Sequence, residues 1–271
     1  MSLRLGVSVI GLAAPPLDAE IVGAIASSRI VETLELSPIL FPGGDNDPGR
    51  KLLIDAVAAS PRLSIPTFHA VFGQEFDLSQ TDSEMRRNAI DRLIADMKAA
   101  RDFDAETIVV HPSSEPIDEA DRPARIKALK VSLSEIEERL RRYGMRMALE
   151  LLPRTCLGRT PEELLDFVGD FGDEFGFCLD ANHLTNTQDR LCETVRLLAP
   201  RLYDIHVSDY FGGDECHNLP GNGTNDWRAF RATLEEVGYT GPFTYELSRR
   251  IADTPVARLR AIEENFSALF A

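Results

Sequence analysis

The sequence of 271 residues predicts a single α/β domain, a (β/α)8 TIM barrel spanning residues 1–271. Eight short apolar segments alternate with helix-like segments at intervals of roughly 25 to 40 residues, which is typical of βα units. No linker, low-complexity tract or change in composition marks a domain boundary. The glycine-rich phosphate loop of dinucleotide-binding folds does not follow the first segment, so a closed barrel is favoured over an open sheet.

The predicted elements follow one another along the whole chain. The eight strands are expected at residues 3–9, 31–36, 63–69, 106–111, 145–150, 175–180, 201–207 and 242–247. Clear helix patterns between them are Glu84–Arg101, Arg125–Arg142, Glu162–Phe171 and Trp227–Val237. Two helix starts carry local signals: Thr81 to Glu84 fits a capping box, and Thr160 is followed by a proline suited to the first helical position.

Composition narrows the classes of function. The net charge of −15 disfavours nucleic acid as a partner, because binding to phosphate backbones depends on Lys and Arg. The apolar runs are shorter than the roughly 20 residues of a membrane span, and the start lacks the charge and length of a signal peptide. We therefore expect a cytoplasmic protein without membrane contact. The four cysteines show no metal-binding spacing and suggest neither a thiolate zinc site nor a disulfide scaffold.

Four polar residues each close a predicted strand in the second half of the chain: Glu150, Asp180, His206 and Glu246. Strand C-termini gather on one face of a parallel barrel, so these side chains are expected to converge there. Three carboxylates and one imidazole suit a hard or borderline divalent cation. The pattern therefore predicts a metal-dependent enzyme.

All five histidines fall at predicted strand ends or in the loops that follow them. Taken singly, such residues are often structural: Asp180 can cap a turn, and Asp204 or Asp209 can satisfy His206. It is the joint placement that favours a functional site. Further candidates for metal or substrate binding are His69, His111, His183, Glu215 and His217.

Several stretches resemble the xylose isomerase-like TIM-barrel superfamily, namely HAVFG, VVHPSS, LELLP, LDANHL, HVSD, HNLPGNGTNDW and YELS. The resemblance runs from LGVS near the start to the final helix. This superfamily includes sugar isomerases and epimerases, inosose-processing enzymes and endonuclease IV. The fold hosts several chemistries, so the resemblance alone does not select one reaction.

The ketose 3-epimerase-like members hold one divalent metal with Glu, Asp, His and Glu from strands five to eight, and the four residues above match these positions. The resemblance implies a divalent-metal-dependent isomerase or epimerase with one Mn, Mg, Co or Zn ion and a small sugar or polyol-derived carbonyl substrate. Glu150 and Glu246 would remove and return a proton through a metal-stabilised enediolate. His183 matches a substrate contact, and His217 stands where many epimerases carry Arg. A dehydratase could use the same residues.

Endonuclease IV uses the same four positions within a three-zinc cluster, and its additional ligands fall on His69, His111, His183, Glu215 and His217, with Glu215 replacing Asp. This implies the alternative of a zinc-dependent abasic-site phosphodiesterase with up to three Zn ions. The loops after the second and third strands are acidic, which favours a small carbohydrate-like substrate over DNA. A non-enzymatic sugar-binding or regulatory barrel stays open. A homo-oligomer is compatible with the sequence, and Phe72 and Phe76 are candidates for a lid or an intersubunit contact.

Overall fold

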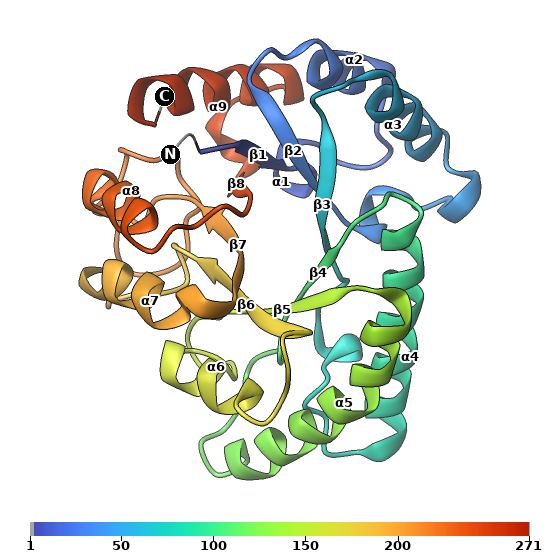
Figure 1. Ribbon diagram of the computed structural model, residues 1–271, viewed down its shortest axis with the longest axis vertical. Coiled ribbons are helices and arrows are strands. Elements are labelled where there is room, and N and C mark those ends of the chain that lie inside the picture. The colour runs from blue at the N-terminus through green and yellow to red at the C-terminus, as the bar shows by residue number, and fades with distance from the viewer. Residues whose placement is uncertain (1–2, 271) are drawn as a thin grey trace.

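The computed structural model describes residues 3–270 and shows a closed barrel of eight parallel strands in the order of the chain (Figure 1). Pairing of β1 with β8 closes the barrel, which confirms the predicted fold. The strands are β1 (Leu5–Ser8), β2 (Val31–Leu36), β3 (Ser64–His69), β4 (Thr107–Val110), β5 (Arg146–Glu150), β6 (Phe175–Asp180), β7 (Leu202–Val207) and β8 (Phe243–Tyr245).

The first and last strands are shorter than the predicted ranges 3–9 and 242–247. Val9 already begins a short helix. Glu246 follows β8 directly, and its main-chain N–H still donates to the Val207 carbonyl at 3.3 Å. Glu246 therefore keeps its place at the C-terminal end of the barrel, beside the end of β7.

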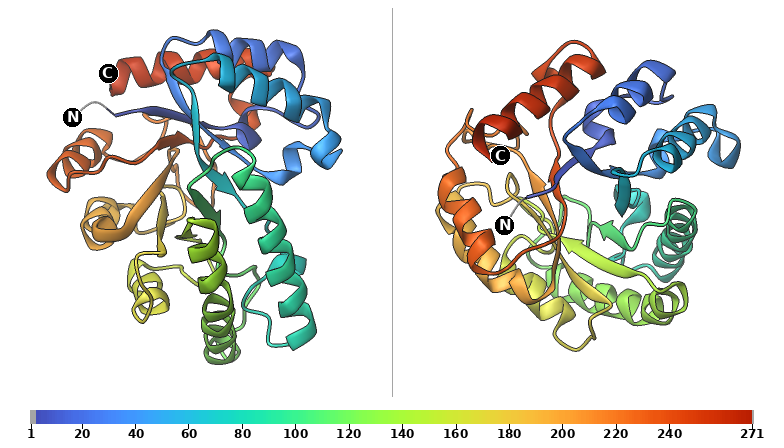
Figure 2. Two further views of the ribbon diagram at one scale, coloured as in Figure 1. Left: turned by 45° about the vertical axis from the view of Figure 1, so that its right-hand side comes forward. Right: turned by 45° about the horizontal axis from the view of Figure 1, so that its top comes forward.

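Helices surround the barrel on its outside (Figures 1 and 2), and the last helix lies beside α2 near the start of the chain. They are α1 (Val9–Leu12), α2 (Ala19–Ser27), α3 (Pro48–Ala59), α4 (Ser83–Arg101), α5 (Arg122–Tyr143), α6 (Pro161–Val168), α7 (Leu191–Leu198), α8 (Trp227–Glu236) and α9 (Pro255–Leu269). Six single 3-10 turns join them within residues 3–270: η1 (Pro38–Leu40), η2 (Gly44–Asn46), η3 (Gln74–Phe76), η4 (Gln188–Arg190), η5 (Ala199–Arg201) and η6 (Arg249–Ile251).

The helix starts confirm one predicted N-cap and correct another. Thr160 caps α6 as predicted, and its hydroxyl accepts from the Glu163 N–H at 3.2 Å. The capping box assigned from Thr81 was wrong, because Asp82 is the cap and its carboxylate accepts two main-chain N–H groups at 2.9 Å. A carboxylate at this position also interacts favourably with the positive end of the helix dipole.

Alternation along the strands separates two environments. Outward-facing residues such as Leu34, Phe68 and Ile205 join the large apolar core between the sheet and the helices. A second, small cluster of Val109, Ala148 and Cys178 is separate from it. Because strand side chains alternate with a period of two, Ala148 and Cys178 share the inward face with the residues that end β5 and β6.

Two further expectations concern the described residues. None of the helices between residues 3 and 270 is long and apolar enough to cross a bilayer. The four cysteines are all free thiols, in agreement with their spacing.

Candidate metal centre

The four predicted ligands meet at the C-terminal end of the barrel. Nδ1 of His206 lies 3.0 Å from Glu246 Oε2, 3.5 Å from Glu150 Oε1 and 4.0 Å from Asp180 Oδ2. One donor atom from each residue lies within 4.8 Å of the others. Glu150, Asp180 and His206 are buried, whereas Glu246 is 20% exposed. We refer to these residues as the four-ligand group.

Unsatisfied atoms show that this group suits a cation. His206 Nδ1 and Asp180 Oδ2 are buried, and among residues 3–270 neither has a hydrogen-bond partner in suitable geometry, although Nδ1 lies 3.0 Å from Glu246 Oε2. Such atoms are costly to bury without a partner. Around an octahedral ion with bonds of about 2.1 Å, ligand atoms lie about 3.0 Å apart when adjacent and about 4.2 Å apart when opposite, and the three distances from His206 Nδ1 fall within this range. The chemistry and the spacing of the donors therefore fit a divalent metal ion.

His206 is oriented from its other side by Glu35 on β2. His206 Nε2 lies 3.1 Å from Glu35 Oε2, and both side chains are fully buried. A carboxylate that accepts from one imidazole nitrogen leaves the other as a metal ligand. Glu35 was not among the residues predicted from the sequence, although a carboxylate inside the apolar strand VETLEL was a usable signal.

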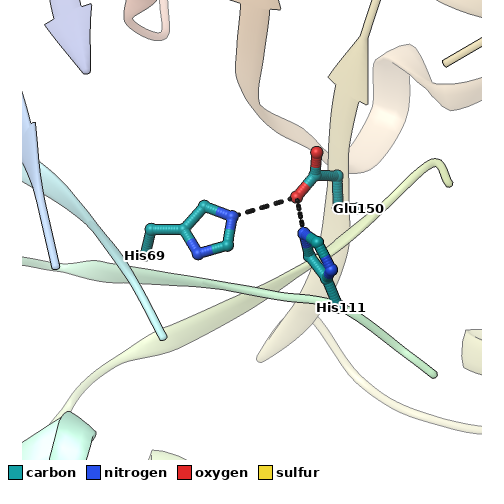
Figure 3. Close-up of side chains that lie close together, drawn as sticks. All are labelled: His69, His111 and Glu150. Atoms are coloured by element: carbon teal, nitrogen blue, oxygen red, sulfur yellow. Dashed lines mark hydrogen bonds and ion pairs between the residues drawn. The ribbon is translucent and has the colours of Figure 1, made fainter. Parts of the chain in front are cut away.

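A second group joins His69 at the end of β3, His111 just after β4, and Glu150 (Figure 3). Nε2 of His69 and Nε2 of His111 lie 3.1 Å and 3.0 Å from the same oxygen, Glu150 Oε2. The other oxygen of Glu150 lies 3.3 Å from His183 Nδ1. Glu150 therefore lies between two groups of candidate ligands, and both of its oxygens contact imidazole nitrogens.

A third group consists of Asp180, His183 and His217. Glu215 Oε2 lies near both histidines, 3.6 Å from His183 Nε2 and 3.8 Å from His217 Nε2. The other oxygen of Glu215 is 2.5 Å from the Arg154 guanidinium. Asp180 belongs to this group and to the four-ligand group, so all nine candidate residues from the sequence lie in one connected cluster.

Carboxylates dominate the electrostatics of this cluster. Burial opposes the protonation of His69 and His217, but neighbouring carboxylates outweigh it and raise the pKa of each to about 9. Burial is also the main reason that the pKa of Asp180 is raised to about 6. These imidazoles therefore hold protons that a metal ion would displace on binding.

Two cavities reach the cluster. The larger, of about 570 Å³, is lined by His217, Glu246 and Glu215 together with residues after β8. The smaller, of about 280 Å³, is lined by His111, Phe72 and Glu215, among others. The Phe72 ring stacks on His111 with centroids 4.6 Å apart, so this loop aromatic covers part of the smaller cavity.

Solved structures share this architecture over almost the whole chain. A D-tagatose 3-epimerase-like protein is 22% identical, with 98% of each chain covered and a TM-score of 0.75. D-Psicose 3-epimerase from Clostridium cellulolyticum H10 is 17% identical, with 99% of each chain covered and a TM-score of 0.79. 3-Keto-D-glucoside 4-epimerase from E. coli is 18% identical, with 99% coverage of each chain and a TM-score of 0.76. At these identities the likeness shows a common fold.

Sequence comparison gives the family. No curated protein matches the chain. The model of the xylose isomerase-like TIM barrel family matches residues 37–269, which include all nine candidate residues. The chain therefore belongs to the xylose isomerase-like TIM barrel family.

Proposed function

We propose that the protein is a divalent-metal-dependent isomerase or epimerase acting on a small carbohydrate-like carbonyl substrate. The observation that carries this proposal is the four-ligand group, one member of which, Glu246, lines the larger cavity. The shared fold with proteins described as D-psicose 3-epimerase and 3-keto-D-glucoside 4-epimerase supports the same class of reaction.

Glu246 is the better placed of the two proposed proton carriers. A divalent cation, when bound, polarises a substrate carbonyl and so eases removal of a proton from the adjoining carbon. Burial works against ionisation of Glu246, but His206 and His217 outweigh it and hold its pKa well below the usual range. Glu246 is therefore an ionised carboxylate beside a cavity, as a general base must be.

Glu150 is more deeply buried than Glu246, and contacts with imidazoles hold its carboxylate in place. Its exposed fraction is only 1%, and its Oε2 is already contacted by His69 and His111. A role in returning the proton requires that this oxygen leave at least one of the two imidazoles when substrate binds. His183 and His217, which lie on the cavity side of the cluster, are suited to contact substrate hydroxyls.

The test is exchange of substrate hydrogen with solvent. Protein loaded with Mn²⁺ is incubated with ketoses in D2O, and deuterium at carbon is followed by NMR. We expect exchange that is abolished by chelation and lowered about 10²–10⁴-fold by Glu246→Gln. Glu264→Gln, an exposed change on α9, is the matched control. Full turnover in Glu246→Gln on an exchanging substrate would rule out this role.

Hydrolysis of a phosphodiester is the second candidate. The specific observation in its favour is that, among residues 3–270, two further ligand groups share Glu150 and Asp180 with the four-ligand group, and a third, of Cys178, Asp204 and His206, shares His206 with it. Clusters of two or more ions can generate hydroxide and stabilise both oxygens of a displacement. Metal analysis of protein purified without chelator separates the candidates. One ion per chain favours the isomerase, whereas two to three zinc ions and cleavage of an abasic-site duplex favour the hydrolase.

A further inference from the structure

The larger cavity contains two arginines that the proposed chemistry does not use. Arg249 and Arg250 belong to η6, the 3-10 turn after β8, and line the same cavity as Glu246 and His217. In TIM barrels the loops after strands seven and eight are frequent sites of phosphate binding. The residues that follow β7 and β8 therefore place the candidate catalytic carboxylate of Glu246 in one cavity with the guanidinium groups of Arg249 and Arg250.

The two cavities differ in whether carboxylates form ion pairs with their arginines. In the smaller cavity, Arg154 contacts carboxylates of Glu115, Asp214 and Glu215, so its charge is neutralised. Arg249 instead donates from Nε and Nη2 to the main-chain carbonyl of Ile10, at 3.0 and 2.8 Å. Among residues 3–270, no carboxylate lies within ion-pair distance of Arg249 or Arg250. The larger cavity thus keeps two guanidinium groups that no ion pair neutralises, in a chain of net charge −15.

The segment that carries these arginines is held in place. Ser248 N–H donates to the His217 carbonyl at 2.9 Å, which ties the segment to the loop after β7. A side chain at Gly11 would lie 2.5 Å from the Leu247 carbonyl oxygen, so only glycine lets α1 approach this closely. The Arg250 side chain forms no hydrogen bond or ion pair with residues 3–270. Its guanidinium is therefore available to a ligand, while the main chain that carries it is held in place.

We infer that the larger cavity binds the anionic group of the substrate, a phosphate or a carboxylate, through Arg250 with Arg249 beside it. Guanidinium groups match both anions by paired, charge-assisted hydrogen bonds. Glu215 and Glu246 line the same cavity and would repel an anion if the arginines did not offset them. This inference rests on the proposed function, because it names the class of carbonyl substrate that reaches Glu246.

Binding of three probes that share a ketohexose skeleton tests the inference. D-fructose, D-fructose 6-phosphate and D-fructuronate are titrated calorimetrically into the full chain loaded with Mn²⁺. We expect one anionic probe to bind at least about tenfold more tightly than D-fructose, since hydrogen bonds between a guanidinium and an anion are stronger than those to a neutral hydroxyl. The tighter probe identifies phosphate or carboxylate as the recognised group.

Three variants, Arg249→Gln, Arg250→Gln and Arg260→Gln, assign the contact. Arg250→Gln should remove the preference for the anionic probe and leave the affinity for D-fructose unchanged. Arg260→Gln, an equally exposed change on α9 outside this cavity, should keep the preference. Circular dichroism verifies that all three variants are folded. The inference is overturned if neither anionic probe binds more tightly than D-fructose, or if Arg249→Gln and Arg250→Gln both keep the preference.

Deuterium exchange in the same samples separates this inference from the proposed function. A preference for an anion that depends on Arg250, without exchange at carbon in any probe, supports the anion subsite and contradicts the isomerase. Exchange that is equally fast with D-fructose and the anionic probes, and unchanged in Arg250→Gln, supports the isomerase and overturns the subsite.

Discussion

Glu35 and His206 form a hydrogen bond inside the barrel, with His206 Nε2 3.1 Å from Glu35 Oε2. The two residues are 171 positions apart and lie on β2 and β7, and both are fully buried. With Nε2 donating to Glu35, Nδ1 is the nitrogen that faces the carboxylates of the four-ligand group. The proton on one nitrogen therefore determines which nitrogen can bind a metal.

Replacing Glu35 by Gln should weaken divalent metal binding by about tenfold, the lower end of the range for residues that orient a ligand. Gln keeps the volume and an acceptor oxygen but removes the charge that supports the His206 tautomer. Mn²⁺ affinity by calorimetry and the visible spectrum of the Co²⁺ form are the measurements. Glu32→Gln on the same strand is the control, and equal affinity in the two variants would contradict the role of Glu35.

Mutation should distinguish the four-ligand group from the group of His69, His111 and Glu150 by its effect on bound metal. His206→Ala should lose the tightly bound ion, because His206 belongs to the four-ligand group, whereas His111→Ala should keep one ion per chain. Metal content after dialysis, measured by mass spectrometry, checks both variants. Loss of all metal from His111→Ala would show instead that the group in Figure 3 holds the tightest site.

Stabilisation of the protein by a divalent metal should grow as the pH rises from about 6.5 to about 9. Burial opposes protonation of His69 and His217, yet carboxylates raise the pKa of each from 6.5 to about 9. Without metal, their contribution to stability is therefore complete below pH 6.5 and is lost as the pH rises through 9. Metal ions compete with these protons, so stabilisation by Mn²⁺ should grow over the same interval.

Melting temperatures between pH 6 and 9.5, with chelator and with saturating Mn²⁺, measure this effect. The two curves should diverge as the pH rises. Parallel curves would mean that neither imidazole exchanges its proton for a metal ion.

Asp209 should be essential for the loop that carries Glu215 and His217. Its carboxylate is fully buried and accepts hydrogen bonds at 2.7–3.1 Å. The donors are the main-chain N–H groups of Tyr210, Gly221, Gly223 and Asn225 and the indole N–H of Trp227. Asp209→Asn turns an acceptor into a donor here and should lower the free energy of unfolding by about 3 kcal/mol.

Urea unfolding measures this loss. Asp214→Asn, a change at an exposed position of the same loop, should alter the free energy of unfolding by less than about 1 kcal/mol. Similar losses in the two variants would mean that the Asp209 network does not hold the loop.

The amino-acid sequence by itself determined the alternation of strands and helices and the position of each candidate ligand at a strand end or in the loop that follows it. These features are local, because strand periodicity and helix caps depend on neighbours in the chain. The convergence of Glu150, Asp180, His206 and Glu246 could be predicted for the same reason, since each closes an apolar segment in a parallel barrel. The misassigned cap at Thr81 shows the limit, because two adjacent capping residues compete and only the folded main chain selects Asp82.

Only the tertiary structure decided which atoms face each other. Closure of the barrel and the register of its strands bring Glu35 across to His206, and place His69 and His111 on one oxygen of Glu150. Whether the Arg250 guanidinium can bind a ligand also depends on whether a carboxylate lies close enough in space to pair with it. Such contacts join residues far apart in the sequence, and their distances depend on strand register and loop packing, which no local pattern encodes.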